Sequence, residues 1–120
     1  YNFYTYTGSR KVDITFILGD NINAKFIAGS IQDTKSMLPT LSVRDTIINE
    51  ENPNPNTLVV CDIVTYKSNW FPTDVTHRIV DIKTDENGRY FIFKGDNNVN
   101  ADPQKVRDSD IINRVLVIVK

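Results

Sequence analysis

The chain of 120 residues has the length of one domain, and a domain of that size buries a modest core without metals or several disulfides. Hydrophobic residues make up 40% of the chain and charged residues 24%, both ordinary values for a globular domain. The formal net charge of -1 and the absence of a lysine or arginine run argue against a basic nucleic-acid-binding surface, so we expect no nucleic-acid partner.

The apolar pattern along the chain is that of strands. Alternating or β-branched runs predict six of them, at residues 12–18, 24–28, 57–67, 75–84, 89–94 and 111–120. The pair Asn87 and Gly88 tolerates positive φ and predicts a hairpin between the fourth and fifth strands. Asparagines and prolines mark residues 49–56 as a loop, and no segment has a helical period with caps. We therefore expect a mostly β fold, a barrel or a folded-over sheet, with few or no helices.

The sequence contains neither a candidate membrane-spanning segment nor a pair of cysteines that could form a disulfide. No stretch approaches the roughly 20 apolar residues that a spanning helix needs, and no secretory signal is visible. The one cysteine, Cys61, ends an apolar run that starts at Leu58, and we interpret it as a small buried hydrophobe. Because the chain begins with Tyr1 instead of methionine, we expect it to be a piece of a longer protein.

Three short segments carry side chains that catalysis uses, at residues 34–41, 76–80 and 94–102. Taken singly, each is typical of a turn or of a structural side chain. Taken together, they supply what a serine nucleophile requires, because Ser36 needs a neighbouring base and His77 is the only histidine. An unperturbed imidazole has a pKa of about 6.5, which suits that task, and an aspartate can fix its tautomer. The chain order serine, histidine, aspartate is acceptable because this geometry recurs in several chain orders.

The same segments resemble the conserved boxes of type I signal peptidases. Residues 36–41, Ser-Met-Leu-Pro-Thr-Leu, look like the family's Ser-Met-x-Pro-Thr box, and residues 62–66 resemble its Gly-Asp-Ile-Val strand. Residues 77–80, His-Arg-Ile-Val, resemble the box of the general base, and residues 94–98 resemble the Lys-Gly-Asp-Asn box. Residues 112–115 are similar to the closing Ile-x-Gly-Arg segment, so the boxes occur in the family's order. The resemblance implies a signal-peptidase-like β fold and a serine endopeptidase.

The histidine selects a subtype within that family. Most bacterial members place a lysine where His77 stands, whereas archaeal and endoplasmic-reticulum members place a histidine. The resemblance therefore implies Ser36 as nucleophile and His77 as general base. In this subtype an aspartate after the Gly-Asp-Asn box orients the histidine, and the matching position is Asp102. We rank Asp102 first for that role and keep Asp96, in the same segment, as the alternative or supporting carboxylate.

The resemblance also implies an oxyanion hole and a substrate. The Ser36 backbone N–H would hold the oxyanion, and Thr34 stands where the family carries a hydroxyl that donates a second hydrogen bond. The substrates would be exported preproteins cut after a small-x-small pattern, bound as an extended segment along a strand edge. Ile31, Met37 and Leu38 flank the nucleophile and are candidates for the specificity pockets, although core packing explains them equally well.

The family also implies a location. Its members are held by a transmembrane helix before the serine box, with the catalytic domain on the extracytoplasmic or lumenal face. We expect the present chain to be the catalytic domain without that anchor, and we expect no metal and no cofactor. One histidine and one cysteine make a poor zinc site.

Two other enzymatic or binding interpretations remain open at this stage. Four positions lack the family's glycine, namely Lys35, Arg44, Cys61 and Asn113, which fits a binding module that has lost turnover. A self-cleaving repressor domain shares the fold and the serine box, but it uses lysine as base. Its cleavage site would be the Ala28–Gly29 pair, which lies too close to Ser36 to fold back.

A calcium-binding loop is the last alternative. Oxygen-bearing side chains alternate at Asp96, Asn98, Asn100 and Asp102, as ligands do in such loops. The central glycine and the closing glutamate of that motif are both missing, so we prefer the peptidase interpretation.

Overall fold

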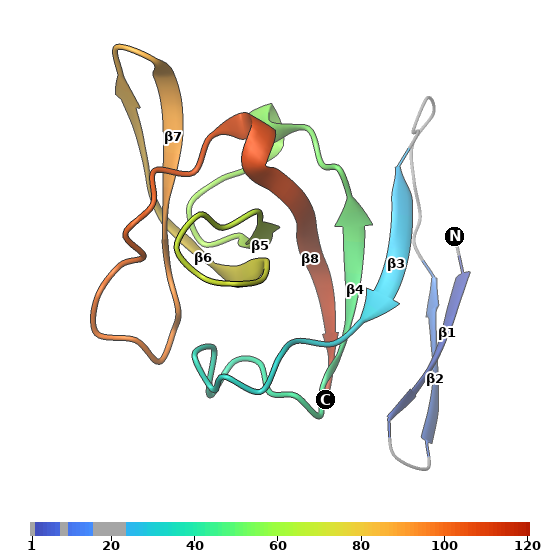
Figure 1. The fold of residues 1–120 in the computed structure, drawn as a ribbon. Coiled ribbons are helices and arrows are strands. Elements are labelled where there is room, and N and C mark those ends of the chain that lie inside the picture. The colour runs from blue at the N-terminus through green and yellow to red at the C-terminus, as the bar shows by residue number, and fades with distance from the viewer. Residues whose placement is uncertain (1, 8–9, 16–23) are drawn as a thin grey trace.

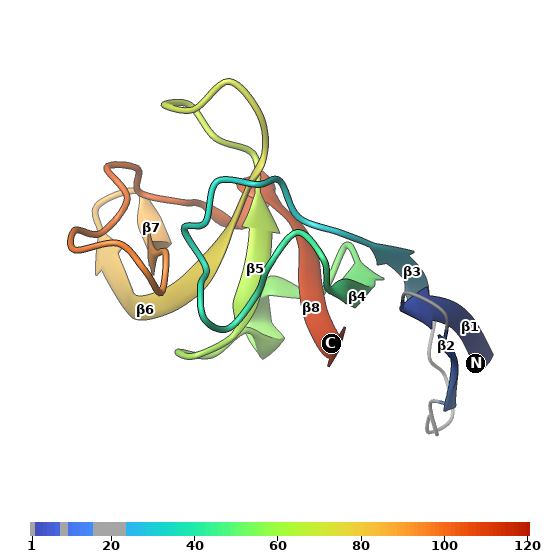
Figure 2. The ribbon, with the colours of Figure 1, turned by 90° about the horizontal axis from the view of Figure 1, so that it is seen from below.

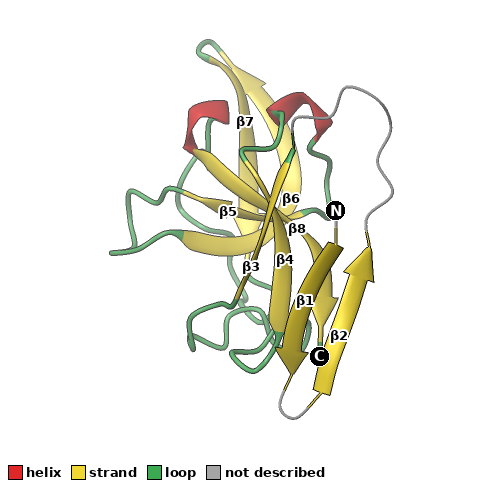
Figure 3. Cartoon of the chain, turned by 90° about the vertical axis from the view of Figure 1, so that its right-hand side faces the viewer, coloured by secondary structure: helices red, strands yellow, loops and turns green. Residues whose placement is uncertain are grey.

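The computed structural model describes the backbone of residues 2–7, 10–15 and 24–120, and the side chains of Thr15 and of residues 24–120. The described chain forms eight strands: β1 (Asn2–Thr7), β2 (Arg10–Thr15), β3 (Lys25–Gly29), β4 (Thr46–Glu51), β5 (Ile63–Tyr66), β6 (Val75–Asp85), β7 (Gly88–Lys94) and β8 (Ile111–Val119). Two 3₁₀ helices of three residues each, η1 (Pro55–Thr57) and η2 (Asp108–Asp110), lie at the same end of the molecule (Figure 3).

Six of these strands form one antiparallel sheet in the order β3-β4-β8-β5-β6-β7 (Figure 1). β1 and β2 pair only with each other in this part of the chain, and they lie beyond the edge strand β3. The prediction of a mostly β fold with few helices is therefore confirmed. The sheet stays open between its edges β3 and β7, so the closed barrel that the strand spacing allowed does not form.

The predicted hairpin is present, and two strands escaped prediction. Asp85 pairs with Gly88 at the turn between β6 and β7, and Gly88 has φ 106, a value that favours glycine. β1 was not expected, and β4 lies partly in the segment predicted as a loop. The polar end of β4 is satisfied by pairing, since Arg114 donates to Glu50 Oε1 at 2.6 Å. Of the strand predicted at residues 12–18, the last three residues lie outside the described residues.

The strand predicted at residues 57–67 is much shorter in the structure. Only Ile63–Tyr66 is a strand, because the chain turns at Val59–Asp62 and Cys61 adopts φ 87. The Asp62 side chain closes this turn by accepting from the Val59 N–H at 2.9 Å. Cys61 is exposed, so the interpretation of this residue as a buried hydrophobe is wrong.

The core has two hydrophobic clusters. The larger cluster consists of Leu58, Val64, Tyr66, Val75, Ile79, Phe91, Phe93 and Val106, and the smaller one of Met37, Leu41, Ile47 and Ile63. Burying one such side chain stabilises the fold by about 1.5–3 kcal/mol. Met37 and Tyr66 belong to these clusters, so the segments that contain them are anchored in the core.

The described residues include no helix that is long and apolar enough to cross a membrane. Seen from below, the loop between β5 and β6 stands clear of the sheet, and the segment after β3 passes in front of β5 and β8 (Figure 2). These two segments supply Ser36 and Trp70 of the site described next, whereas His77 lies on β6 and Asp102 follows β7.

Candidate active site

His77 lies on β6, where alternation of side chains determines its position. Val75, His77 and Ile79 are buried, while the residues between them are more exposed, as expected for side chains on opposite faces of a strand. His77 pairs with Val64 of β5, and Val64 is fully buried in the larger cluster. The imidazole is therefore held at the boundary between the core and the surface by two packed strands.

Ser36 lies in a turn that we call the nucleophile turn, residues 34–41. Met37 anchors this turn because its side chain is buried in the smaller cluster, and its carbonyl accepts from the Leu41 N–H at 2.9 Å. Lys35 has φ 62, the left-handed conformation that favours glycine. The backbone therefore keeps the shape of a glycine turn although the sequence has a lysine, at a cost of about 1–2 kcal/mol.

The residues after β7 hold the nucleophile turn by hydrogen bonds and by close packing. The Asn97 N–H donates to the Ser36 carbonyl at 2.8 Å, and the Asn97 side chain donates to the Lys35 carbonyl at 3.1 Å. Gly95 packs so closely that a Cβ there would lie 2.7 Å from the Ser36 carbonyl oxygen. A glycine is needed at this position because the two backbones touch.

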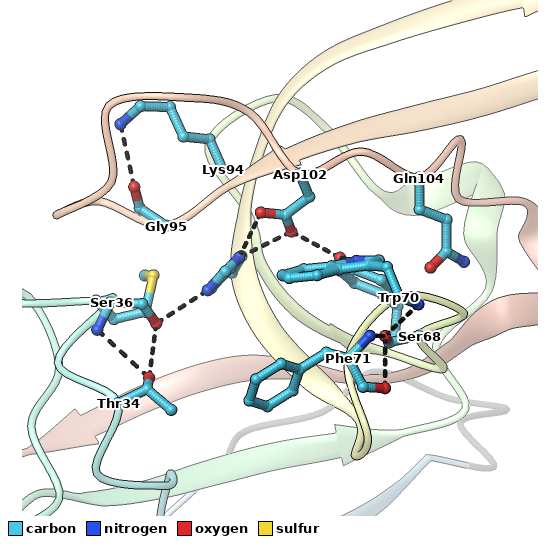
Figure 4. Close-up of polar contacts among 12 residues, drawn as sticks. Thr34, Ser36, Ser68, Trp70, Phe71, Lys94, Gly95, Asp102 and Gln104 are labelled. Atoms are coloured by element: carbon cyan, nitrogen blue, oxygen red, sulfur yellow. Dashed lines mark hydrogen bonds and ion pairs between the residues drawn. The ribbon is translucent and has the colours of Figure 1, made fainter.

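Ser36, His77 and Asp102 form one hydrogen-bonded chain. His77 Nε2 lies 2.9 Å from Ser36 Oγ, and His77 Nδ1 lies 2.8 and 2.9 Å from the two Asp102 oxygens (Figure 4). The side chains of His77 and Asp102 are only 6% and 3% exposed. The Asp102 N–H donates to the Phe93 carbonyl at 2.7 Å, which fixes the carboxylate beside β7. A hydroxyl, an imidazole and a carboxylate in this order are the arrangement that activates a serine.

Asp96 binds a different partner. Its two oxygens accept from Arg78 Nε and Nη2 at 2.9 and 2.8 Å, and Thr40 donates to it as well. The Arg78 guanidinium holds the pKa of Asp96 below its usual value, and the carboxylate in turn raises the pKa of Arg78. Arg78 also donates to the Cys61 carbonyl at 2.8 Å. Of the two aspartates left open by the sequence, Asp102 contacts His77, and Asp96 ties the nucleophile turn to β6.

Thr34 stands beside the nucleophile, as the resemblance implied. Its Oγ1 lies 2.9 Å from Ser36 Oγ and accepts from the Ser36 N–H at 3.4 Å (Figure 4). The second bond is long for an N–H donor, so it is weak. The two groups named for the oxyanion hole, the Ser36 N–H and the Thr34 hydroxyl, therefore lie side by side next to Ser36 Oγ.

A cleft of 370 Å³ opens next to the Ser36–His77 pair. Its walls come from the segment after β3, from the loop between β5 and β6, and from the strand ends between them. Ile31 and Met37 line it, as expected for pocket residues, whereas Leu38 lies against a separate cavity of 170 Å³. Trp70 and Phe71 line the opposite wall. The cleft mixes polar side chains with apolar ones such as Ile31, Trp70 and Phe71, and Ser36 and His77 are part of its lining, which suits a bound peptide.

The alternating oxygens of the proposed calcium loop do not converge. Asp96 faces Arg78, and Asp102 faces His77. Among residues 24–120, no group of three or more histidine, cysteine, aspartate or glutamate side chains could hold a metal ion. The loop is therefore organised around a guanidinium and an imidazole.

Two residues of the site were missed by the sequence reasoning, Tyr66 and Trp70. The Tyr66 hydroxyl donates to Asp102 Oδ2 at 2.6 Å, and the Trp70 indole donates to the Tyr66 oxygen at 3.0 Å. Burial, followed by the bond to Asp102, raises the pKa of Tyr66. Their spacing of four residues across a loop carries no signal that would have found them.

Comparisons of the chain with protein-family models, with curated proteins and with solved structures find no match.

Proposed function

We propose that this chain is a serine endopeptidase that removes signal peptides from exported proteins, of the histidine type that its motifs resemble. The observation that carries the proposal is the unbroken series of hydrogen bonds from Ser36 Oγ through His77 to Asp102, with distances of 2.8–2.9 Å. The side chains of His77 and Asp102 are buried, and Ser36 and His77 line the cleft. Removing a proton from serine is the one task for which this arrangement is suited.

Catalysis would begin with a peptide carbonyl placed beside Ser36 Oγ. His77 Nε2 takes the hydroxyl proton while Oγ bonds to the carbonyl carbon, and Asp102 stabilises the imidazolium that forms. His77 then gives the proton to the leaving amine, and the C–N bond breaks to leave an acyl-enzyme. Water hydrolyses the ester with His77 again as base. Proton and electron pair return to their starting places after each cycle.

The oxyanion would be held by the Ser36 N–H and the Thr34 hydroxyl. The N–H makes a long bond of 3.4 Å to Thr34 Oγ1, and the Thr34 hydroxyl shares a bond of 2.9 Å with Ser36 Oγ itself. An incoming oxyanion accepts from both, so the rearrangement needs only a rotation of the Thr34 hydroxyl. One donor of this kind lowers the barrier by about 3 kcal/mol.

The substrate would lie extended in the cleft between the segment after β3 and the strand β6. A cleft of 370 Å³ is large enough for a short extended peptide segment, and the small-x-small preference is proposed from the resemblance of the motifs. The expected partners are exported preproteins, with the domain held at the extracytoplasmic or lumenal face by a membrane anchor outside this chain. No metal or cofactor takes part in the proposed steps.

The proposal is tested with a preprotein that carries an Ala-x-Ala site and with the same preprotein carrying Phe at the position before the cut. The chain should release the signal segment of the first substrate only, with the cut mapped by mass spectrometry. Failure to cut either substrate, including by the chain joined to a membrane anchor, would favour the binding module that has lost turnover.

A further inference from the structure

The hydrogen-bond chain of the site does not end at Asp102. It continues through the Tyr66 hydroxyl, 2.6 Å from Asp102 Oδ2, to the Trp70 indole nitrogen, 3.0 Å from the Tyr66 oxygen. Tyr66 is fully buried and packs against Phe93 in a tilted arrangement with ring centroids 4.6 Å apart, while Trp70 is 40% exposed. The chain therefore joins a buried phenol to a side chain at the surface of the cleft.

The hydrogen bonds from Trp70 through Tyr66 to Asp102 allow only one donor–acceptor direction. An indole N–H donates and never accepts, so the Tyr66 oxygen is the acceptor of the Trp70 bond. The single Tyr66 proton is then directed to Asp102, and the raised pKa of Tyr66 keeps that proton in place. An ionised carboxylate can only accept, so Asp102 accepts from both Tyr66 and His77. Nδ1 of His77 thus carries the proton, and Nε2 presents its lone pair to Ser36.

The position of Trp70 is itself fixed by its loop, residues 67–74. The Ser68 hydroxyl accepts from the N–H groups of Trp70 and Phe71 at 3.2 and 2.7 Å, which closes a tight turn. Gln104, 7% exposed, accepts from the Asn69 N–H at 2.8 Å and donates to the Lys67 carbonyl at 3.1 Å. Gln104 follows Asp102 by two residues, so one segment holds both ends of the chain.

We infer that Tyr66 and Trp70 are positioning residues for the proposed reaction: through Asp102 they set the proton of His77 on Nδ1, the tautomer that a base toward Ser36 needs. The inference rests on the proposed function. Because Trp70 and Phe71 also line the cleft, the loop that meets the substrate is the loop that completes the hydrogen-bond chain. Alignment of the base therefore depends on the conformation of this substrate-facing loop.

The first test is Tyr66→Phe, which keeps the ring and deletes the hydroxyl. Without this donor the Asp102 carboxylate is held less firmly against Nδ1 and stabilises the imidazolium less, so the acid limb of the kcat/KM profile should move to lower pH. We expect kcat to fall about tenfold to a hundredfold, as for loss of one hydrogen bond to a charged group. Trp70→Phe should shift the profile in the same direction by less. The matched control is Tyr90→Phe, a surface tyrosine beside Arg107, which should leave the profile unchanged.

A second readout does not depend on turnover. His77 is the only histidine, so its two ring nitrogens can be assigned without ambiguity in nitrogen-15 NMR spectra. The neutral ring should carry its proton on Nδ1 in the original chain, and this population should fall in Tyr66→Phe. A folded Tyr66→Phe with unchanged tautomer and unchanged pH profile would overturn the inference. A changed tautomer in a chain that cuts no preprotein would retain the inference and defeat the proposed function.

Discussion

The two halves of the site are built in different ways. His77 and Asp102 stand on or beside β6 and β7, are almost inaccessible to solvent, and are backed by Tyr66 and Phe93 in the larger cluster. Ser36 and Thr34 lie on the nucleophile turn, which is held by two buried side chains, Met37 and Leu41, and by backbone contacts with the loop after β7. The base half is therefore buried, whereas Thr34 and Lys35 of the nucleophile half are exposed and are held by hydrogen bonds. Substitutions in the two halves should fail for different reasons.

The largest contrast is expected between the two aspartates of the loop after β7. Asp102→Asn replaces one carboxylate oxygen by an amide N–H donor and removes the charge, which favours the wrong tautomer of His77, so kcat should fall about 10⁴-fold with little change in the free energy of unfolding. Asp96→Asn leaves the hydrogen bonds among Ser36, His77 and Asp102 intact and removes the ion pair with Arg78. The main effect should therefore be a lower free energy of unfolding. The measurement is kcat together with chemical unfolding for both variants. Unchanged kcat in Asp102→Asn together with a large loss in Asp96→Asn would mean that Asp96 orients the base.

The nucleophile half is probed by Thr34→Val, which removes the hydroxyl and keeps the shape. If this hydroxyl stabilises the oxyanion, kcat should fall about 10²–10³-fold while KM stays nearly constant. Thr34→Ser is the matched control and should retain most of the activity. An unchanged kcat in Thr34→Val would leave the Ser36 N–H as the sole donor of this pair.

The contact between the two halves is probed by Gly95→Ala. The added Cβ would meet the Ser36 carbonyl at 2.7 Å and displace the nucleophile turn by a fraction of an ångström to an ångström. A misplacement of about 1 Å costs about 10²-fold in rate, so we expect such a fall in kcat in a folded protein. Gly29→Ala is the control, because its Cβ would lie 3.8 Å from Asn49 in ordinary contact. Normal activity in Gly95→Ala would show that the turn tolerates movement.

The smallest effect is expected in the pH dependence of stability. The pKa of Asp96 is lowered in the fold by Arg78, so its stabilising contribution is fully present above the usual carboxyl pKa of about 4. It is lost as the pH falls from there through the lowered pKa. In Asp96→Asn this contribution is absent, so the acid side of the stability curve should flatten. Parallel curves for the two proteins, measured by urea unfolding between pH 2 and 7, would contradict this role.

Much of this contrast could be read from the sequence. The β-branched runs and the Asn87–Gly88 turn predicted the hairpin that carries His77, because strand alternation and turn chemistry are local properties. β4 was missed because Asn49, Glu50 and Glu51 look like a loop until Arg114, far along the chain, pairs with one of them. That pairing is a property of the folded sheet.

The site shows the same division. Residue types and their order predicted Ser36, His77 and Asp102, but the sequence could not separate Asp102 from Asp96, since the loop path decides which carboxylate meets the imidazole. Tyr66 and Trp70 were out of reach for the same reason. At two of the four positions that lack the family's glycine, Lys35 and Cys61 adopt positive φ themselves, so the backbone there keeps the conformation that glycine favours.

The most direct measurement compares preprotein cleavage by the original chain and by Ser36→Ala, both joined to a membrane anchor and both checked for folding. The account predicts one cut after the small-x-small site by the original chain and a rate lower by about 10⁵-fold or more in Ser36→Ala, because Ser36 Oγ is the atom that forms the acyl-enzyme. Cleavage at the same site and at the same rate by Ser36→Ala would contradict the account.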